Sequence, residues 1–197
     1  MTAVPSVDGA QVLELAILIT DDSLKELSRR SWVVSHPSEL LASLPSWHQV
    51  AFAALSAGGN GLFDAILGPG ARPLGEVASE ALAFVTEWCP KGKCRLAGFS
   101  VHGDREVLRR ELPLIYGHFS HQILDVSTVL SMATMWAPGK LFLRPRQEEA
   151  ATTAAAAAAE PKSNEGAKTN GQHRAMADVE YSLETMLFLR KAFFENA

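Results

Sequence analysis

Residues 94–129, CRLAGFSVHGDREVLRRELPLIYGHFSHQILDVSTV, decide which fold this chain adopts. Two short apolar runs, at 95–101 and 122–126, predict strands, and a helical pattern follows each of them. Asp104 stands where the first of these strands ends and the next helix begins. Because functional groups in α/β proteins gather at the carboxyl ends of strands, Asp104 is the first candidate for a functional acid.

The segments before and after this stretch continue the alternation of strands and helices. Residues 11–20, QVLELAILIT, form a continuous branched apolar run typical of a strand buried on both faces. Residues 31–36 predict a second strand after a turn, and residues 75–89 predict a helix with one apolar stripe. Residues 1–10 predict a turn, because they contain Pro5 and Gly9.

The last helix is predicted from apolar residues that recur near a 3.6-residue period. These residues, which we expect in the core, are Met176, Val179, Leu183, Met186 and Leu187. The order of elements predicts an α/β fold, with a mixed central β-sheet flanked by helices, in one domain spanning residues 1–197. Within that domain, residues 146–172 contain a run of alanines and few bulky apolar side chains, and they predict a flexible insertion.

Composition excludes several classes of protein. The net charge of −4 argues against non-specific binding to long nucleic acid, which needs a basic surface. No apolar run is long enough to predict a membrane span, and no secretory signal pattern opens the sequence. The glycine-rich segment 56–62 lacks the Lys-Ser/Thr pair of a phosphate-binding P-loop.

Cys89 and Cys94 are the two cysteines of the chain, in the segment WCPKGKC. They are either half of a zinc site or two reduced thiols beside a turn. No second cysteine pair and no histidine pair has the spacing of a zinc finger, so the thiol interpretation is favoured over zinc. A disulfide is equally disfavoured for an intracellular chain.

A second candidate cluster opens the last helix, at residues 173–178, HRAMAD. An acid at a strand-to-helix junction and a histidine with an acid at a helix start can converge on one metal ion. The alternative for Asp178 alone is a favourable interaction of its carboxylate with the helix dipole.

Four segments resemble the oligoribonuclease family, and they occur in the family's order. Residues 97–108, AGFSVHGDREVL, match A-G-N-S-V-H-x-D-x-x-F-L, and residues 124–129, LDVSTV, match I-D-V-S-T-V. Residues 173–179, HRAMADV, match H-R-A-L-D-D-I, and residues 12–21, VLELAILITD, match I-I-E-M-A-x-L-I-T-D. The resemblance covers nearly the whole chain apart from the alanine-rich segment.

The resemblance implies an RNase H-like exonuclease fold of the DEDDh type. It implies a 3′→5′ exoribonuclease that degrades short RNA oligonucleotides to nucleoside monophosphates with two Mg²⁺ or Mn²⁺ ions. Asp104 and Asp178 then correspond to metal ligands, and His173 corresponds to the general base. Paired divalent ions need shared carboxylate oxygens, and a neutral imidazole accepts a proton near pH 7.

The resemblance also implies a substrate-binding set and an assembly. The substrate-binding positions are Val4, Trp47, Ser100 and His121. Trp47 has an ordinary alternative, which is packing under a loop. The family further implies a homodimer, short RNA as the partner, no membrane, and an intracellular location, either cytoplasmic or mitochondrial.

The chain departs from the family at its first motif, D-L-E-M-T-G-L, whose Asp and Glu supply the other two metal ligands. The sequence begins Met1-Thr2-Ala3-Val4, so the first central strand of the family's sheet is expected to be missing. Glu14 does not substitute, because it lies inside the next strand. Two explanations stay open: a longer protein whose upstream residues restore the motif, or a catalytically decayed paralogue that binds short RNA or dimerises.

Further substitutions favour decay. Phe99 replaces the Asn of the second motif, Ala177 replaces the first Asp of the third motif, and His121-Gln122 replaces the family's Tyr-Arg. Because two of the family's four metal ligands are missing as well, the 197-residue chain is expected to have little or no activity of its own.

Overall fold

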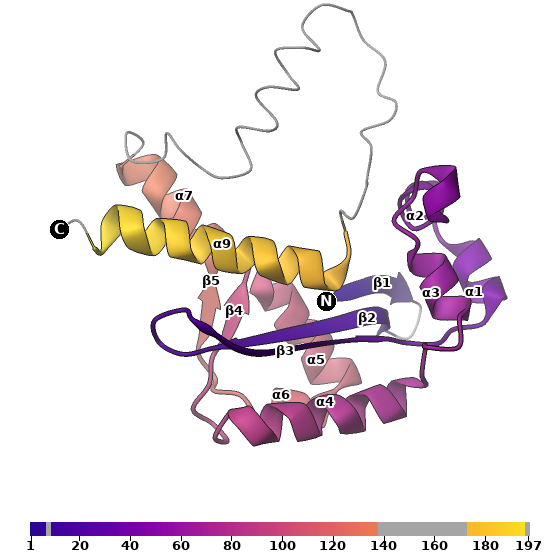
Figure 1. The fold of residues 1–197 in the computed structure, drawn as a ribbon, viewed down its shortest axis with the longest axis horizontal. Coiled ribbons are helices and arrows are strands. Elements are labelled where there is room, and N and C mark those ends of the chain that lie inside the picture. The colour runs from indigo at the N-terminus through magenta and orange to yellow at the C-terminus, as the bar shows by residue number, and fades with distance from the viewer. Residues whose placement is uncertain (7–8, 138–172, 196–197) are drawn as a thin grey trace, which may run out of the picture.

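Two β-sheets with helices packed around them make up the computed structural model, which describes residues 1–6, 9–137 and 173–195 (Figure 1). The strands are β1 (Thr2–Ser6), β2 (Gly9–Thr20), β3 (Glu26–Val33), β4 (Leu96–Gly98) and β5 (Ile123–Asp125). The helices are α1 (Ser38–Ser43), α2 (Ser46–Ala51), the 3-10 helix η1 (Leu55–Ala57), α3 (Leu62–Leu67), α4 (Leu74–Trp88), α5 (Val101–Glu111), α6 (Pro113–Tyr116), α7 (Val126–Trp136) and α9 (Ala175–Phe193).

The predicted α/β fold is confirmed, and antiparallel and parallel pairing occupy different sheets. The first sheet has the order β1-β2-β3 with antiparallel neighbours, and the second pairs β4 with β5 in parallel. Helix α9 lies on one side of β2, and α4, α5 and α6 lie on the other side (Figure 1). Both faces of β2 are thus covered, which explains its continuous apolar sequence.

The turn predicted for residues 1–10 is wrong, because Thr2–Ser6 form β1. This strand pairs with β2 from Thr2↔Glu14 to Ser6↔Gly9. Pairing with a neighbouring strand outweighs the turn preference of Pro5, since proline is tolerated on an edge strand. Part of the strand that was expected to be missing is therefore present, along the first half of β2.

Several predicted boundaries shift. Strand β3 begins at Glu26 rather than near residue 31, because it forms a hairpin with β2 in the register Thr20↔Glu26. Strand β4 ends at Gly98, and α5 begins at Val101, so that Asp104 lies inside the first turn of α5.

The apolar stripe predicted for the last helix is rotated in the structure. The buried residues of α9 are Ala175, Ser182, Thr185 and Leu189, whereas Leu187 is exposed. Three of these four buried side chains are small, which allows α9 to pack closely on β2.

Three groups of buried side chains form the core. The largest joins β2 and β3 to α4, α5 and α6, the second joins β1 and β2 to α1, α2 and α3, and the third joins α7 to α9. The predicted insertion at 146–172 lies outside the described residues. Among the residues described, no helix is long and apolar enough to cross a membrane.

Candidate functional site

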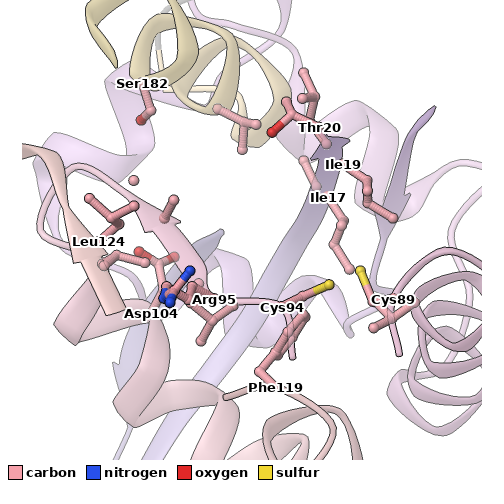
Figure 2. A pocket seen from close by; sticks show the side chains of 18 of the residues that line it. Ile17, Ile19, Thr20, Cys89, Cys94, Arg95, Asp104, Phe119, Leu124 and Ser182 are labelled. Atoms are coloured by element: carbon pink, nitrogen blue, oxygen red, sulfur yellow. The ribbon is translucent and has the colours of Figure 1, made fainter. Parts of the chain in front are cut away.

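A cavity of about 740 Å³ lies between the two sheets, and both predicted metal-binding acids line it. Asp104 reaches its wall from α5, and Asp178 reaches it from the first turn of α9. Figure 2 shows Asp104 on one side of the cavity and Ser182 of α9 across from it. The structure therefore brings together two acids that are 74 positions apart in the sequence.

Asp104 takes its position from the sharp start of α5. Ser100, at the N-cap, has a φ of 50°, a left-handed conformation that ends β4 and starts the helix within a few residues. An acid in the first turn also interacts favourably with the helix dipole. The Oδ1 atom of Asp104 lies 3.0 Å from the amino group of Met1, so one carboxylate oxygen already has a cationic partner.

His173 and Trp47 meet at the start of α9. Their rings are 5.1 Å apart and nearly perpendicular. The carbonyl oxygen of His173 accepts a hydrogen bond from the Asn60 side chain at 3.3 Å, which fixes the turn before the helix. Trp47 is 53% exposed, so an aromatic face remains open to a ligand. His173 does not line the cavity that holds Asp104 and Asp178.

Glu14 is a residue of the site that the sequence analysis placed only inside a strand. It is 3% exposed, and its carboxylate accepts the Ala175 N–H at 2.7 Å. The same carboxylate accepts hydrogen bonds from Arg174 Nη2 at 2.7 Å and from Arg174 Nε at 3.1 Å. Glu14 thus ties β2 to the N-terminus of α9, which carries His173 and Asp178. An acid inside an otherwise apolar strand marks Glu14 as unusual in the sequence, although its distant partner cannot be identified there.

Asp125 organises the loop on the other side of Asp104. Its carboxylate accepts hydrogen bonds from the backbone N–H groups of Ser100 and Ser127 and from the Ser127 hydroxyl, and it pairs with His102 at 3.0 Å. Burial raises the pKa of Asp125, but the bonds from His102, Ser127 and Ser100 outweigh it and lower that pKa to about 2. Asp125 is therefore ionised, and it joins the end of β5 to the start of α5.

The remaining predicted substrate-binding residues lie apart from one another. Val4 is 1% exposed and packs in the core with Leu13 and Leu41. Ser100 is exposed at the start of α5, and His121 is exposed before β5. Their contacts with a substrate stay predictions.

Phe99, at the position of the motif's Asn, makes an aromatic contact. Its ring stacks on Tyr181 of α9, with centroids 5.2 Å apart and an angle of 11° between the planes. Its backbone N–H also donates to the Ser182 hydroxyl at 3.3 Å. These contacts join the end of β4 to α9 directly beside the two acids.

The donors present do not by themselves fit a pair of divalent ions. Among the described residues, no group of three or more His, Cys, Asp or Glu side chains is placed to hold a metal ion. Asp104 and Asp178 supply two carboxylates, whereas divalent ions of this kind need about six oxygen ligands each. Cys89 and Cys94 are free thiols, and no zinc cluster forms around them in the part of the chain described.

Comparison with known proteins identifies the relatives of this chain. The chain is 28% identical over 191 residues to the mitochondrial oligoribonuclease of Bos taurus, and the alignment covers 96% of this chain and 69% of that protein. It is 31% identical over 132 residues to the oligoribonuclease of Pseudomonas aeruginosa, and that alignment covers 66% of this chain and 70% of that protein. A third relative, the oligoribonuclease of Pectobacterium atrosepticum, is 29% identical over 189 residues, with 94% of this chain and 88% of that protein covered.

No family model matches the chain. The three relatives nevertheless share one name across mammals and bacteria, and their alignments span most of the chain. The α/β arrangement, with acids from α5 and α9 on one cavity, is consistent with the RNase H-like exonuclease fold that the sequence motifs predict. The chain belongs to the oligoribonuclease family.

Proposed function

We propose that this chain acts on short RNA oligonucleotides as a 3′→5′ exoribonuclease that releases nucleoside monophosphates and requires Mg²⁺ or Mn²⁺. One observation carries the proposal: Asp104 and Asp178 line one cavity, and the helix that bears Asp178 begins beside the His173–Trp47 pair. The names of the relatives supply the substrate class.

Each residue has a role that follows from its chemistry. The exposed ring of Trp47 offers a stacking surface for a terminal base, and such stacking tolerates any base. The imidazole of His173, exposed at the start of α9, accepts the proton of the attacking water near pH 7. The carboxylates of Asp104 and Asp178 provide hard oxygen donors for the cation.

The 197-residue chain is expected to hydrolyse RNA much more slowly than the Pseudomonas aeruginosa relative. Asp104 and Asp178 alone leave a cation site underfilled, because no group of three or more His, Cys, Asp or Glu side chains in the described part of the chain is placed to hold a metal ion. This same observation favours a second candidate function, in which the chain binds short RNA or dimerises without hydrolysis.

Hydrolysis of a ribodinucleotide tests the first function. Turnover is expected to need Mg²⁺ or Mn²⁺, to stop with EDTA, and to vanish in Asp104→Asn and in His173→Ala. The control is Asp64→Asn, which removes an exposed acid in the first turn of α3. Robust turnover that survives both changes at the site would overturn the assignment of these residues.

Calorimetry of dinucleotide binding separates the two candidates. Binding that needs no metal, in a chain that shows no hydrolysis at any metal concentration, identifies the non-catalytic function. Binding that appears only with metal and is accompanied by hydrolysis identifies the exonuclease.

The proposal includes a homodimer and an intracellular location, in the cytoplasm or the mitochondrion. The mammalian relatives carry the word mitochondrial in their names. Light scattering on the purified chain measures the oligomeric state, and a monomer at micromolar concentration contradicts the dimer. Cell fractionation tests the location.

A further inference from the structure

Cys89 and Cys94 flank a tight turn that brings their side chains together. Cys89 directly follows α4, and Cys94 stands just before β4. Between them, the Lys93 N–H donates to the Pro90 carbonyl oxygen at 3.1 Å, and Gly92 has a φ of 75°. These are the hydrogen bond and the left-handed third residue of a type II turn, which reverses the chain within four residues.

The two sulfur atoms are in contact. A hydrogen bond joins the Cys89 and Cys94 side chains, and Figure 2 shows their sulfur atoms close together. Both side chains are free thiols. Two cysteines can be bridged without backbone movement only if their side chains point toward each other. The hydrogen bond between the thiols shows that this pair meets that condition.

The loop after α6 holds the backbone of both cysteines. His118, which is 8% exposed, donates from Nε2 to the Cys89 carbonyl oxygen at 2.7 Å. The Ser120 N–H donates to the Cys94 carbonyl oxygen at 2.8 Å. The Gly92 N–H at the tip of the turn donates to the His118 carbonyl oxygen, also at 2.8 Å. The folded chain therefore fixes the separation of the two thiols, which an unfolded chain leaves free.

The two thiols differ in their access to solvent. Cys89 is 4% exposed, and burial raises the pKa of its thiol to about 12, so it reacts slowly with reagents in solution. Cys94 is partly exposed, and the exposed cations Lys91, Lys93 and Arg95 surround it in the sequence, with no acid between residues 88 and 103. Partly exposed thiols in positive surroundings are the reactive ones, and positive charge attracts anionic reagents.

We propose that Cys89 and Cys94 form a redox site that exchanges reversibly with small anionic disulfides of the glutathione class. The Cys94 thiolate attacks one sulfur of the small disulfide, forms a mixed disulfide and releases one small thiolate. Cys89 then gives up its proton and attacks the Cys94 sulfur, which forms the Cys89–Cys94 disulfide and releases the second small thiolate. The two small thiolates take up the two protons, so two protein thiols are oxidised and one small disulfide is reduced.

The second step is intramolecular, because the fold already holds the two sulfur atoms in contact. This proximity offsets the low acidity of the buried Cys89 thiol. A permanent disulfide is disfavoured in an intracellular chain, whereas disulfides that form transiently and sense redox conditions do occur there. The bond ties the end of α4 to the start of β4. The redox site does not depend on the proposed nuclease activity.

Equilibration with mixtures of reduced and oxidised glutathione tests the site on the full chain. The oxidised chain is expected to lose the mass of two hydrogen atoms, to yield a Cys89–Cys94 cross-link after trypsin digestion, and to return to the dithiol with excess reduced glutathione. At one fixed glutathione ratio, the ratio of disulfide to dithiol is expected to be at least about tenfold higher in the folded chain than in the chain unfolded in urea. Equal ratios would show that the fold does not place the thiols, and they would overturn the proposal.

Single serine variants identify which thiol attacks first. Cys89→Ser is expected to stop at a mixed disulfide with one glutathione on Cys94, because the second thiol is gone. Cys94→Ser is expected to gain glutathione at least about tenfold more slowly, because Cys89 is buried. Circular dichroism confirms that both variants are folded before the rates are compared. Equal rates in the two variants would contradict the assignment of Cys94 as the attacking thiol.

Other outcomes would give the pair a different role. A chain that keeps glutathione on both cysteines, or that forms disulfide-linked dimers instead of the internal bond, would overturn the proposal. Tight binding of zinc that blocks oxidation would make the pair part of a metal site, and it would also overturn the proposal. A dithiol that persists in a large excess of oxidised glutathione would refute the reactivity of Cys94.

Discussion

Replacing Glu14 by Gln is expected to destabilise the protein at the junction between β2 and α9. The Glu14 carboxylate is 3% exposed and receives the Ala175 N–H and two guanidinium nitrogens of Arg174. The substitution keeps the size of the side chain and one acceptor oxygen, and it removes the negative charge. It therefore tests the ion pair rather than the packing.

The magnitude follows from two contributions. Breaking a buried ion pair by removing one partner costs about 3–5 kcal/mol. Losing a side-chain acceptor at a helix N-terminus costs about 0.5–2 kcal/mol. The Arg174 side chain is 31% exposed, so the freed guanidinium reaches water and lowers the first cost. The amide oxygen of the Gln still accepts a hydrogen bond at the N-terminus of α9, which lowers the second cost. We therefore expect a total loss of about 2–3 kcal/mol.

Urea unfolding, followed by circular dichroism and tryptophan fluorescence, measures the change. Glu14→Gln is expected to lower the midpoint with an unchanged slope, and the exposed-site control Glu87→Gln is expected to stay within about 0.5 kcal/mol of the parent. The double variant with Arg174→Gln is expected to be less destabilised than the sum of the two single variants, since both remove one interaction. A loss below about 0.5 kcal/mol for Glu14→Gln would refute the reasoning.

Three further changes probe other contacts. Trp47→Ala is expected to weaken dinucleotide binding by about 1–3 kcal/mol in calorimetry, because a base loses its stacking surface, whereas Trp136→Ala, at another exposed tryptophan, is expected to leave binding unchanged. The folded-state pKa of Asp125, about 2, lies below its ordinary value of 3.8, so its stabilisation is present above that value and is lost as the pH falls toward 2. As the pH falls from about 5 to 2, the unfolding free energy of the Asp125→Asn variant is expected to fall by about 1–2 kcal/mol less than that of the parent. Burial, with a hydrogen bond to Cys94, raises the pKa of Cys89 to about 12, and Figure 2 shows the two sulfur atoms close together. Maleimide at about pH 8 is expected to label Cys94 well before Cys89, as mass spectrometry of peptides will show.

The sequence predicted those parts of the fold whose cause is local. The continuous apolar run of β2 requires burial on both faces, and that burial is observed. Asp125 directly precedes α7 and caps it with a carboxylate that accepts the Ser127 N–H, a role for which aspartate is a preferred residue. Asp104 and Asp178 both line one cavity, whereas their role as metal ligands stays a prediction.

The parts that the sequence did not predict depend on distant partners. Strand β1 forms because β2 offers it an edge, and nothing within residues 1–10 reports that edge. The rotated contact face of α9 depends on how closely the helix approaches β2, which small residues such as Ser182 and Thr185 permit. The Glu14–Arg174 pair joins residues 160 positions apart, so no local pattern reveals it.

The position of the two acids depends on how the helices that carry them pack on β2. Asp104 is held by α5 and Asp178 by α9, and these helices lie on opposite sides of β2 (Figure 1). Glu14 fixes one end of α9 to β2, but residues 15–20 of β2 and β4 border a cavity rather than each other. The separation of the two acids is therefore set by the packing of α5 and α9 on β2 as much as by the residues that carry the carboxylates.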